Sequence, residues 1–370
     1  MTLPGLLKET LDRGGSDLHL SAGVPPCVRV DGDLQRLPLP VLTPEQTRHL
    51  ACSGLTDAQR KRFEDDSEID LALAVEGIGR CRGNVFRKKG TVAAVFRLIP
   101  NAIPSLDDLG LPPVIASLAD RPRGLILVTG PTGSGKSTTL AAIVDRINAT
   151  RPVHILTIED PVEYVHRHKT AVVSQRELGS DTHSFPRALR AALREDPDVV
   201  LIGELRDLET MEAALTMAET GHLTLATLHT NSAAQTVTRL VDAFPAHQQA
   251  QVRTQLSLVL EGIVCQTLLK AASGGRVAAL EILVATPAVR HLIRDDKVHQ
   301  IYGVMQTGQE RGGMQTMNQA LGKLVERRIV SREVALAVSA HRDELAALLD
   351  RASHGGSLLV RRLGDSRGLR

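Results

Sequence analysis

A glycine-rich stretch that ends in a lysine and two hydroxyl residues carries the clearest chemical signal in the chain. Its spacing is G-x-x-x-x-G-K-S, the pattern with which backbone N–H groups, an ammonium and a hydroxyl surround a row of phosphates. The nucleotide-binding candidates in it are Gly130, Pro131, Thr132, Gly133, Ser134, Gly135, Lys136, Ser137 and Thr138. An apolar run precedes the stretch and a helical pattern follows it. The sequence therefore predicts a strand, a phosphate-binding loop and a helix.

The last residues of this motif indicate a nucleoside triphosphate with its metal ion. Lys136 is placed to reach the β- and γ-phosphates, and the hydroxyl of Ser137 is a ligand for Mg²⁺. The helix that follows would point the positive end of its dipole at the same phosphates. ATP and Mg²⁺ are therefore the cofactors that we expect.

Carboxylates follow two of the later apolar segments. Segment 154–158 runs into Glu159-Asp160-Pro161-Val162-Glu163, and segment 199–202 runs into Gly203-Glu204. Ligands of open α/β sheets bind beyond the carboxyl ends of the strands, so we expect both groups beside the phosphate loop. Glu159 and Glu163 are candidates for holding Mg²⁺, partly through water, although a solvated turn is the alternative. Glu204 is the candidate general base that activates the attacking water.

Two histidines bracket the apolar segment 223–228. His229 follows the segment, where an imidazole can donate to a γ-phosphate and report whether that phosphate is present. His222 precedes the segment, so it would lie at the opposite edge and serve packing or a subunit contact. A purely structural histidine is the alternative reading of both positions.

The order of these segments predicts an α/β protein in two parts. Residues 1–100 read as a small α+β domain, 101–122 as a proline-rich linker that carries a helix near 113–119, 123–350 as alternating strands and helices, and 351–370 as a disordered tail. Two domains joined in this way could change their relative angle.

Local patterns predict the individual elements of both parts. In the first part we expect helices at 6–13, 44–52 and 56–64, a hairpin at 28–34, and strands at 70–75, 81–87 and 91–99. In the second part we expect a helix at 185–194 and a final amphipathic helix at 331–350. The strands near residues 80–97 carry several arginines, of which Arg82 and Arg97 are candidates for reaching a nucleotide phosphate; solvated side chains are the alternative.

Composition excludes several other classes of protein. The formal net charge is +2 and aromatic residues make up 2% of the chain, which argues against a nucleic-acid partner. No apolar run approaches the roughly 18 residues of a membrane span, and the N-terminus lacks a signal pattern, so we expect a cytosolic protein. Cysteines 27, 52, 81 and 265 stand far apart without a C-x-x-C pair, which indicates reduced thiols and no zinc site.

Together, the motifs described above resemble a known family, the motor ATPases of type II and type IV secretion. Among these, they most resemble the PilT-type pilus-retraction ATPases. The resemblance covers about residues 5–345. The segments that carry it are Ser16-Asp17-Leu18-His19-Leu20-Ser21, Val30-Asp31-Gly32, the phosphate loop, 159–163, 190–198, 203–207 and 221–232.

The resemblance implies a RecA-like P-loop ATPase core preceded by a PAS-like domain, assembled as a homo-hexamer. It implies a cytoplasmic ring at the inner-membrane base of a type IV pilus, which acts on a platform protein and powers pilus retraction and twitching motility. The family's residues of the phosphate-loop lysine, acidic box, catalytic glutamate and histidine box fall on Lys136, Glu163, Glu204, His222 and His229. Its nucleotide-contacting arginines fall on Arg82 and Arg97.

A later helix, 288–295, resembles the family's retraction motif, with His291 in place of asparagine and Asp295 in place of glutamate. Arg290 and Arg294 are expected together on one face, either as a solvated pair or as a contact needed for pulling. Three alternatives stay open. A pilus-extension or type II secretion ATPase would share the catalytic motifs, but these relatives usually carry a four-cysteine zinc site. A nucleic-acid translocase and a nucleotide-gated scaffold without turnover are the others.

Overall fold

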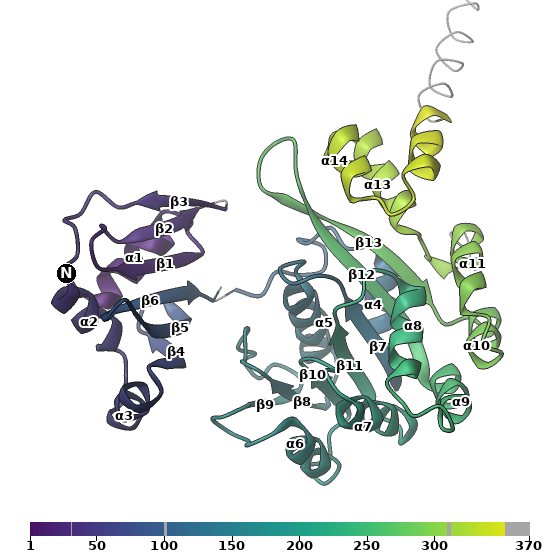
Figure 1. The fold of residues 1–370 in the computed structure, drawn as a ribbon. Helices are drawn as coiled ribbons and strands as arrows, with labels where there is room; N and C mark the ends of the chain where they lie inside the picture. The colour runs from purple at the N-terminus through teal and green to yellow at the C-terminus, as the bar shows by residue number, and fades with distance from the viewer. Residues whose placement is uncertain (31, 100–101, 309–311, 352–370) are drawn as a thin grey trace, which may run out of the picture. The chain divides into compact units, whose positions relative to one another are not determined.

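The structure of the chain is a computed structural model that describes residues 1–30, 32–99, 102–308 and 312–351. It consists of two compact units (Figure 1), of which the first holds residues up to 103 together with 163–165, and the second holds the remainder. Asp31, Pro100 and most of the predicted tail, residues 352–370, lie outside the described residues.

The first unit is built on an antiparallel sheet with the strand order β3-β2-β1-β6-β5-β4. Helices α1 and α2 pack on β1 and β6. Its helices are α1 (Leu3–Asp12), α2 (Pro44–Cys52) and α3 (Asp57–Asp66), and its strands are β1 (Asp17–Ser21), β2 (Cys27–Val30), β3 (Asp33–Arg36), β4 (Glu68–Val75), β5 (Gly79–Lys88) and β6 (Thr91–Leu98). The antiparallel order β2-β1-β6-β5-β4 agrees with the small α+β domain that the sequence predicted.

Capping residues explain where the helices of this unit begin. The hydroxyls of Thr43 and Thr56 each accept a hydrogen bond from the backbone N–H of the third helical residue, a glutamine, and the backbone N–H of each threonine donates to the side-chain oxygen of that glutamine. The predicted helices therefore start within about one turn of the observed ones. Strand β1 was not predicted, although it lies between β2 and β6 and buries Leu18 and Leu20.

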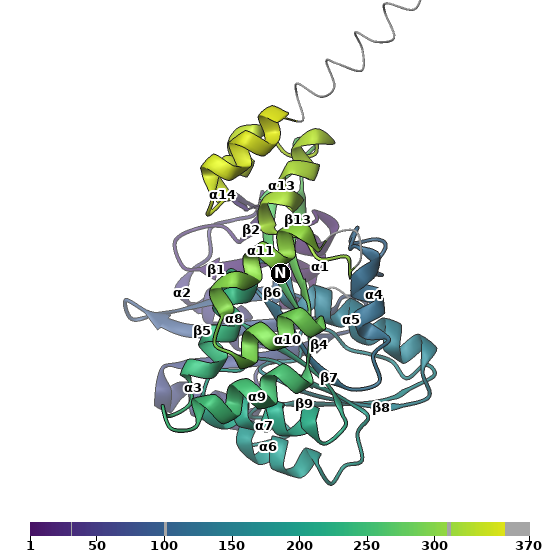
Figure 2. The same ribbon diagram turned by 90° about the vertical axis from the view of Figure 1, so that its right-hand side faces the viewer.

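The second unit is built on a sheet with the strand order β13-β12-β7-β11-β10-β8-β9, in which β13 alone among the described strands runs antiparallel to its neighbour. Figures 1 and 2 show helices on both faces of this sheet. Its strands are β7 (Gly124–Thr129), β8 (His154–Glu159), β9 (Val172–Glu177), β10 (Val199–Ile202), β11 (Leu223–Leu228), β12 (Leu260–Lys270) and β13 (Arg276–Val284). This confirms the predicted α/β class.

Some helices of the second unit come before or between its strands in the chain, and the others follow its last strand, β13. They are α4 (Pro113–Ala119), α5 (Lys136–Thr150), α6 (Phe185–Ala192), α7 (Leu208–Glu219), α8 (Ala233–Asp242), α9 (Gln249–Val259), α10 (Pro287–Arg294), the 3₁₀ helix η1 (Val298–Gln300), α11 (Ile301–Thr307), α13 (Met317–Glu326) and α14 (Arg332–Val338).

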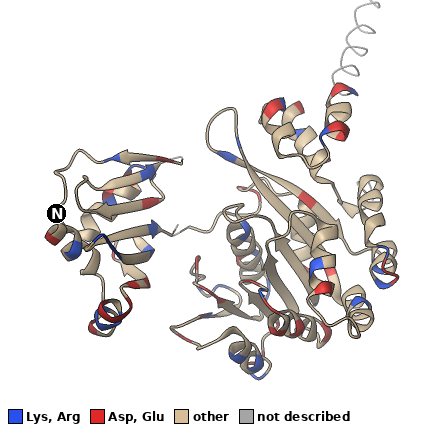
Figure 3. Ribbon diagram, in the orientation of Figure 1, with Lys and Arg blue, Asp and Glu red and all other residues tan. Residues whose placement is uncertain are grey.

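The central strands β7, β11 and β10 consist of uncharged residues that are buried along their whole length (Figure 3). Helices cover both faces of this part of the sheet, and a strand covered on both faces needs apolar side chains on both. Along these three strands, charged side chains therefore occur only in the loops beyond the strand ends. This is where the chemistry of the unit lies.

The segment predicted as a linker is only partly one. From Pro104 onward the chain belongs to the second unit. Helix α4 packs on α5, and Ile115 and Leu118 are buried in the same cluster as Ile126 of β7. The prolines that suggested a linker also start α4, since proline is tolerated at the first turn of a helix.

The predicted final helix is in fact two helices. Helix α14 ends at Val338, and a further helix covers residues 342–351. Between them the hydroxyl of Ser339 donates to Oδ1 of Asn318, 2.7 Å away, and accepts from the backbone N–H of His341. These local bonds take the place of helical ones and break the helix. The expectation of one helix over 331–350 was therefore wrong, as was the end of the helix expected at Arg194, since α6 stops at Ala192.

None of the helices in the described ranges is long and apolar enough to cross a membrane. The four cysteines are buried and free of disulfides.

Candidate functional site

The phosphate loop connects β7 to α5 and has the backbone form that the motif predicts. Gly130, Gly133 and Gly135 all have positive φ angles, of 141°, 78° and 89°. Gly135 is the N-cap of α5, so the helix begins at Lys136. A Cβ atom on Gly130 would lie 2.1 Å from the backbone oxygen of Gln266, which excludes any side chain there.

Gln266, a buried residue of β12, braces the loop from the side. Its Nε2 donates to the backbone oxygen of Ser134 at 2.7 Å, and its Oε1 accepts from the hydroxyl of Thr139 at 2.7 Å. One side chain thus joins the loop to the first turns of α5. Gln266 was not predicted from the sequence because it belongs to none of the recognised motifs and lies more than 120 residues along the chain from the loop.

The ammonium of Lys136 turns back over the loop. Its Nζ donates to the backbone oxygens of Gly130 at 2.8 Å and Pro131 at 3.1 Å. The hydroxyl of Ser134 is buried, without a hydrogen-bond partner in the described part of the chain. A buried hydroxyl of this kind inside a phosphate loop is consistent with a polar ligand.

Glu204 and His229, predicted separately, lie in contact. Glu204 follows β10 and His229 follows β11, and these strands are parallel neighbours in the sheet. Nε2 of His229 is 3.1 Å from Oε1 of Glu204. Strand β11 also neighbours β7, so both side chains leave the edge of the sheet at which the phosphate loop begins.

Arg206 holds the other oxygen of the same carboxylate. Its Nε donates to Oε2 of Glu204 at 2.8 Å, and its NH1 is 3.5 Å from Oδ2 of Asp160. Hydrogen bonding to Glu204 raises the pKa of Arg206. In the sequence, Arg206 belongs to a segment that carries the family resemblance, but no role was expected for it. Its position two residues after the candidate base was the available signal.

The acidic run after β8 is farther along the sheet than predicted. Strands β11 and β10 stand between β7 and β8, so the run is not beside the phosphate loop at the level of the strands. Oε1 of Glu159 accepts hydrogen bonds from the hydroxyl of Thr157 at 2.6 Å and the amide of Gln175 at 3.3 Å. Glu163 is exposed in the loop that connects β8 to β9.

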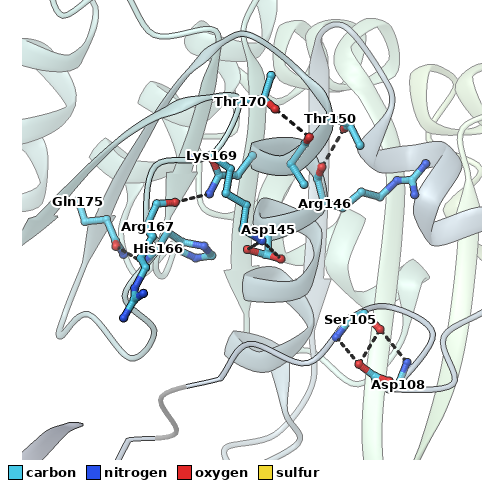
Figure 4. A network of polar contacts seen from close by, with 12 residues as sticks. Ser105, Asp108, Asp145, Arg146, Thr150, His166, Arg167, Lys169, Thr170 and Gln175 are labelled. Carbon is cyan, nitrogen blue, oxygen red and sulfur yellow. Dashed lines mark hydrogen bonds and ion pairs between the residues drawn. The ribbon is translucent and has the colours of Figure 1, made fainter.

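The later part of that β8–β9 loop is fastened to α5, the helix that begins at the phosphate loop. Nζ of Lys169 donates to both oxygens of Asp145, at 2.7 and 2.8 Å, and the side-chain amide of Asn148 donates to the backbone oxygen of Arg167. Figure 4 shows these contacts beside His166. Burial lowers the pKa of His166 to about 4.

In the first unit, Arg82 and Arg97 stand opposite each other on β5 and β6. Both side chains are exposed. Arg97 is also opposite Asp17 of β1, and its Nε donates to Oδ1 of Asp17 at 2.8 Å. Two like charges opposite each other on an antiparallel pair are unfavourable unless an anion lies between or near them.

The remaining site candidates have internal contacts. His222 lies at the start of β11, where its Nδ1 is 2.9 Å from the backbone oxygen of Met217, at the end of α7.

Arg290 is not half of a solvated pair with Arg294. Its guanidinium donates to Ser257 O, Leu258 O, Ala285 O and Oε1 of Glu261. Arg294 is instead exposed and lies near His291.

Comparison with known proteins places this arrangement in a family. The family described as "Type II/IV secretion system protein" matches residues 2–336. The chain is 52% identical over 335 residues to the "Type IV pilus retractation ATPase PilT" of Pseudomonas aeruginosa, covering 90% of this chain and 97% of that protein. The chain belongs to this family, among its PilT-type ATPases.

Other PilT-type proteins support the assignment. A "Twitching motility protein" of Neisseria gonorrhoeae is 51% identical over 311 residues, which is 84% of this chain and 83% of that one. The crystal structure of "the Pilus Retraction Motor PilT and Bound ADP" superposes with a TM-score of 0.88 at 50% identity, covering 94% of this chain and 99% of that one. As a PilT-type protein, the chain is a nucleotide-binding P-loop ATPase.

Proposed function

We propose that the chain is a Mg²⁺-dependent ATPase motor that powers the retraction of type IV pili and so supports twitching motility. The observation that carries the proposal is the set of groups at one edge of one sheet: the phosphate loop after β7, His229 after β11 and Glu204 after β10. The similarity to a pilus retractation ATPase and to a twitching motility protein supports the biological role.

ATP binds the backbone and side chains of the loop in this proposal. The N–H groups of Thr132 to Thr138 surround the phosphates, and Lys136 leaves the carbonyl oxygens of Gly130 and Pro131 to contact the β- and γ-phosphates. The Ser137 hydroxyl and the carboxylates of Glu159 and Glu163 are oxygen donors of the kind that Mg²⁺ prefers. Mg²⁺ held by Ser137 would neutralise phosphate charge, and because β11 and β10 separate β7 from β8, the two carboxylates would act on the ion through water.

Glu204 is the proposed general base. An attacking water has to give its proton to a carboxylate oxygen, and both oxygens of Glu204 have a neighbour: Arg206 donates to Oε2, and Nε2 of His229 lies 3.1 Å from Oε1. Each carboxylate oxygen can accept a second hydrogen bond, but opening one of these contacts would leave an oxygen of Glu204 more basic and more accessible to the water. His229 is the better candidate to move because an imidazole that turns toward the γ-phosphate would release Oε1 of Glu204 and report the phosphate.

The quaternary part of the proposal follows the family resemblance. We propose a homo-hexamer at the cytoplasmic face of the inner membrane, which acts on a platform protein of the pilus and binds neither zinc nor nucleic acid. Arg82 and Arg97 are proposed to contact nucleotide phosphate. The exposure of both side chains supports the proposal, although Arg97 is already paired with Asp17.

Deletion of the gene, followed by complementation, tests the proposal. Cells that lack a retraction motor should keep abundant surface pili but lose twitching, and the wild-type gene should restore it. A gene encoding Lys136→Ala should fail to do so, and the purified variant should lose ATP turnover. Loss of surface pili after deletion would instead indicate an extension motor, and wild-type turnover by Lys136→Ala would contradict the assigned site.

A further inference from the structure

A buried glutamate outside the phosphate site connects two helices that are far apart in the sequence. Glu281 lies on β13 with 3% of its surface exposed, and burial raises the pKa of its carboxyl group. Each of its oxygens accepts one backbone hydrogen bond: Oε1 from the N–H of Ala233 at 2.7 Å, and Oε2 from the N–H of Met317 at 3.3 Å.

Both donors are the first residues of helices. Ala233 begins α8 and Met317 begins α13. The N-caps of these helices, Ser232 and Thr316, accept hydrogen bonds from residues further inside, so the first N–H groups need another acceptor. Glu281 supplies it for both, at the end of each helix where the dipole favours a negative charge.

The two helices belong to different parts of the second unit. Helix α8 begins four residues after His229, the residue that contacts Glu204. Helix α13 packs instead in a hydrophobic cluster with α14 and the outer ends of β12 and β13. Glu281 is therefore the polar connection between the segment that carries His229 and the C-terminal helices.

The surroundings leave room for movement at this connection. A cavity of about 620 Å³ is lined by Pro131 of the phosphate loop, by Asn231 and Ser232 before α8, and by Glu281 and Asn318. Glu281 is also opposite Cys265, which is itself opposite Thr129, the last residue before the phosphate loop. The strand under the carboxylate is thus fixed relative to the loop, while the two helix starts border open space.

We propose that Glu281 is a positioning residue that couples the segment 229–232 to α13. Through it, nucleotide bound at the phosphate loop shifts the first turn of α13. The inference rests on the proposed function, because it needs His229 to respond to the γ-phosphate. When His229 turns, the start of α8 shifts, and the shared carboxylate carries the shift to the first turn of α13.

Removal of a single donor tests this coupling. Met317→Pro deletes one N–H and is compatible with the backbone, since proline is tolerated at the first helical position and Thr316 already has the extended conformation that a following proline requires. Met317→Ala loses the same side chain but keeps the N–H, so it is the matched control. Amide hydrogen exchange of residues 318–326 is measured in the full chain with the ATP analogue AMP-PNP, with ADP and without nucleotide.

In wild type and Met317→Ala we expect at least a twofold difference in exchange rate at α13 between AMP-PNP and ADP. In Met317→Pro the difference should disappear, with the KM for ATP changed less than twofold. An equal nucleotide response in all three proteins, or none in wild type that binds and hydrolyses ATP, overturns the inference. Wild type without ATP turnover would instead contradict the proposed function.

Glu281→Gln tests the same hydrogen bond from the side of its acceptor, since Oε2 of Glu281 accepts from the N–H of Met317. The amide keeps one acceptor oxygen but turns an NH₂ group toward the second N–H, so we expect kcat to fall three- to tenfold at a nearly constant KM. Glu326→Gln, the same change at an exposed position of α13, should leave kcat unchanged. If Glu281→Gln folds and keeps the wild-type kcat and exchange response, Glu281 is not a coupling residue.

Discussion

Nε2 of His229 and Oε1 of Glu204 are 3.1 Å apart at the tips of two parallel strands. Strand pairing between β10 and β11 brings them together, although 24 residues separate them in the chain. The structure thus connects the residue proposed to activate water with the residue proposed to respond to the γ-phosphate.

Glu204→Gln should lower kcat for ATP hydrolysis by roughly 100-fold or more, since loss of a general base typically costs a factor of about 10² to 10⁴. ATP binding should remain, because the phosphate loop is unchanged. Turnover and equilibrium nucleotide binding measure the two effects. Glu212→Gln, an exposed acid of α7, is the control and should match wild type. Full turnover by Glu204→Gln would remove Glu204 from the proposed chemistry.

Because His229 acts on Glu204 in this arrangement, the two substitutions should not be additive. His229→Gln alone should lower kcat by about tenfold, but it should add little to Glu204→Gln. Steady-state kinetics of the two single variants and the double variant give the coupling. Additive losses in kcat would mean that the two side chains act independently.

Gln266→Leu should destabilise the second unit and weaken ATP binding. The substitution leaves the hydroxyl of Thr139 and the backbone oxygen of Ser134 without their buried partner, and each unsatisfied group costs about 1–3 kcal/mol. Chemical denaturation and the KM for ATP measure both effects. Gln251→Leu, an exposed glutamine of α9, should change neither. An unaltered KM in Gln266→Leu would show that the loop keeps its shape without the brace.

Arg290→Ala should cost roughly 2–3 kcal/mol of stability, because the guanidinium satisfies two backbone carbonyls of α9 and one after β13, and pairs with Glu261. Arg294→Ala, which removes an exposed side chain, should stay within about 0.5 kcal/mol of wild type. Urea unfolding compares them. Equal stability of the two variants would contradict the structural role of Arg290.

Acid should destabilise the protein partly through His166. In the folded state its pKa is about 4, below the usual 6.5, so below pH 6.5 the unfolded state binds the proton while the folded state does not. The stability that neutral His166 contributes is therefore present above pH 6.5 and is lost as the pH falls toward 4. The loss is roughly 2–3 kcal/mol, at about 1.4 kcal/mol per pKa unit. His166→Phe should show a shallower loss in denaturation from pH 7 to 4.5.

The sequence predicted the parts of the fold that depend on local pattern. The phosphate loop was found from the spacing of Gly130, Gly135 and Lys136, and α2 was expected at its observed bounds, where the structure shows Thr43 capping a helix that begins at Pro44. Both signals lie within a few consecutive residues. Strand β1 was not predicted, because its alternation of apolar and polar residues is short and its burial depends on β2 and β6, which come from other parts of the chain.

The sequence did not predict contacts that depend on the order of the strands in the sheet. The distance of Glu159 from the loop depends on β11 and β10 lying between β7 and β8, and no local pattern encodes that order. No local pattern encodes the contacts of Gln266 and Glu281 either. The two residues lie on neighbouring antiparallel strands and reach the loop and the helix starts through tertiary structure alone.

The first and second glycines of the phosphate loop are required for different reasons. A side chain at position 130 would collide with the backbone of β12, whereas one at position 133 would meet nothing within 4 Å. Folding therefore excludes any side chain at position 130, whereas at position 133 it opposes one only through the positive φ angle of 78°, and selection to bind nucleotide adds to that weaker constraint. In a duplicated gene that had lost its ATPase role but still made a folded protein, mutations should accumulate at position 133 while position 130 stays glycine. The two positions together could distinguish a retired copy from a working one.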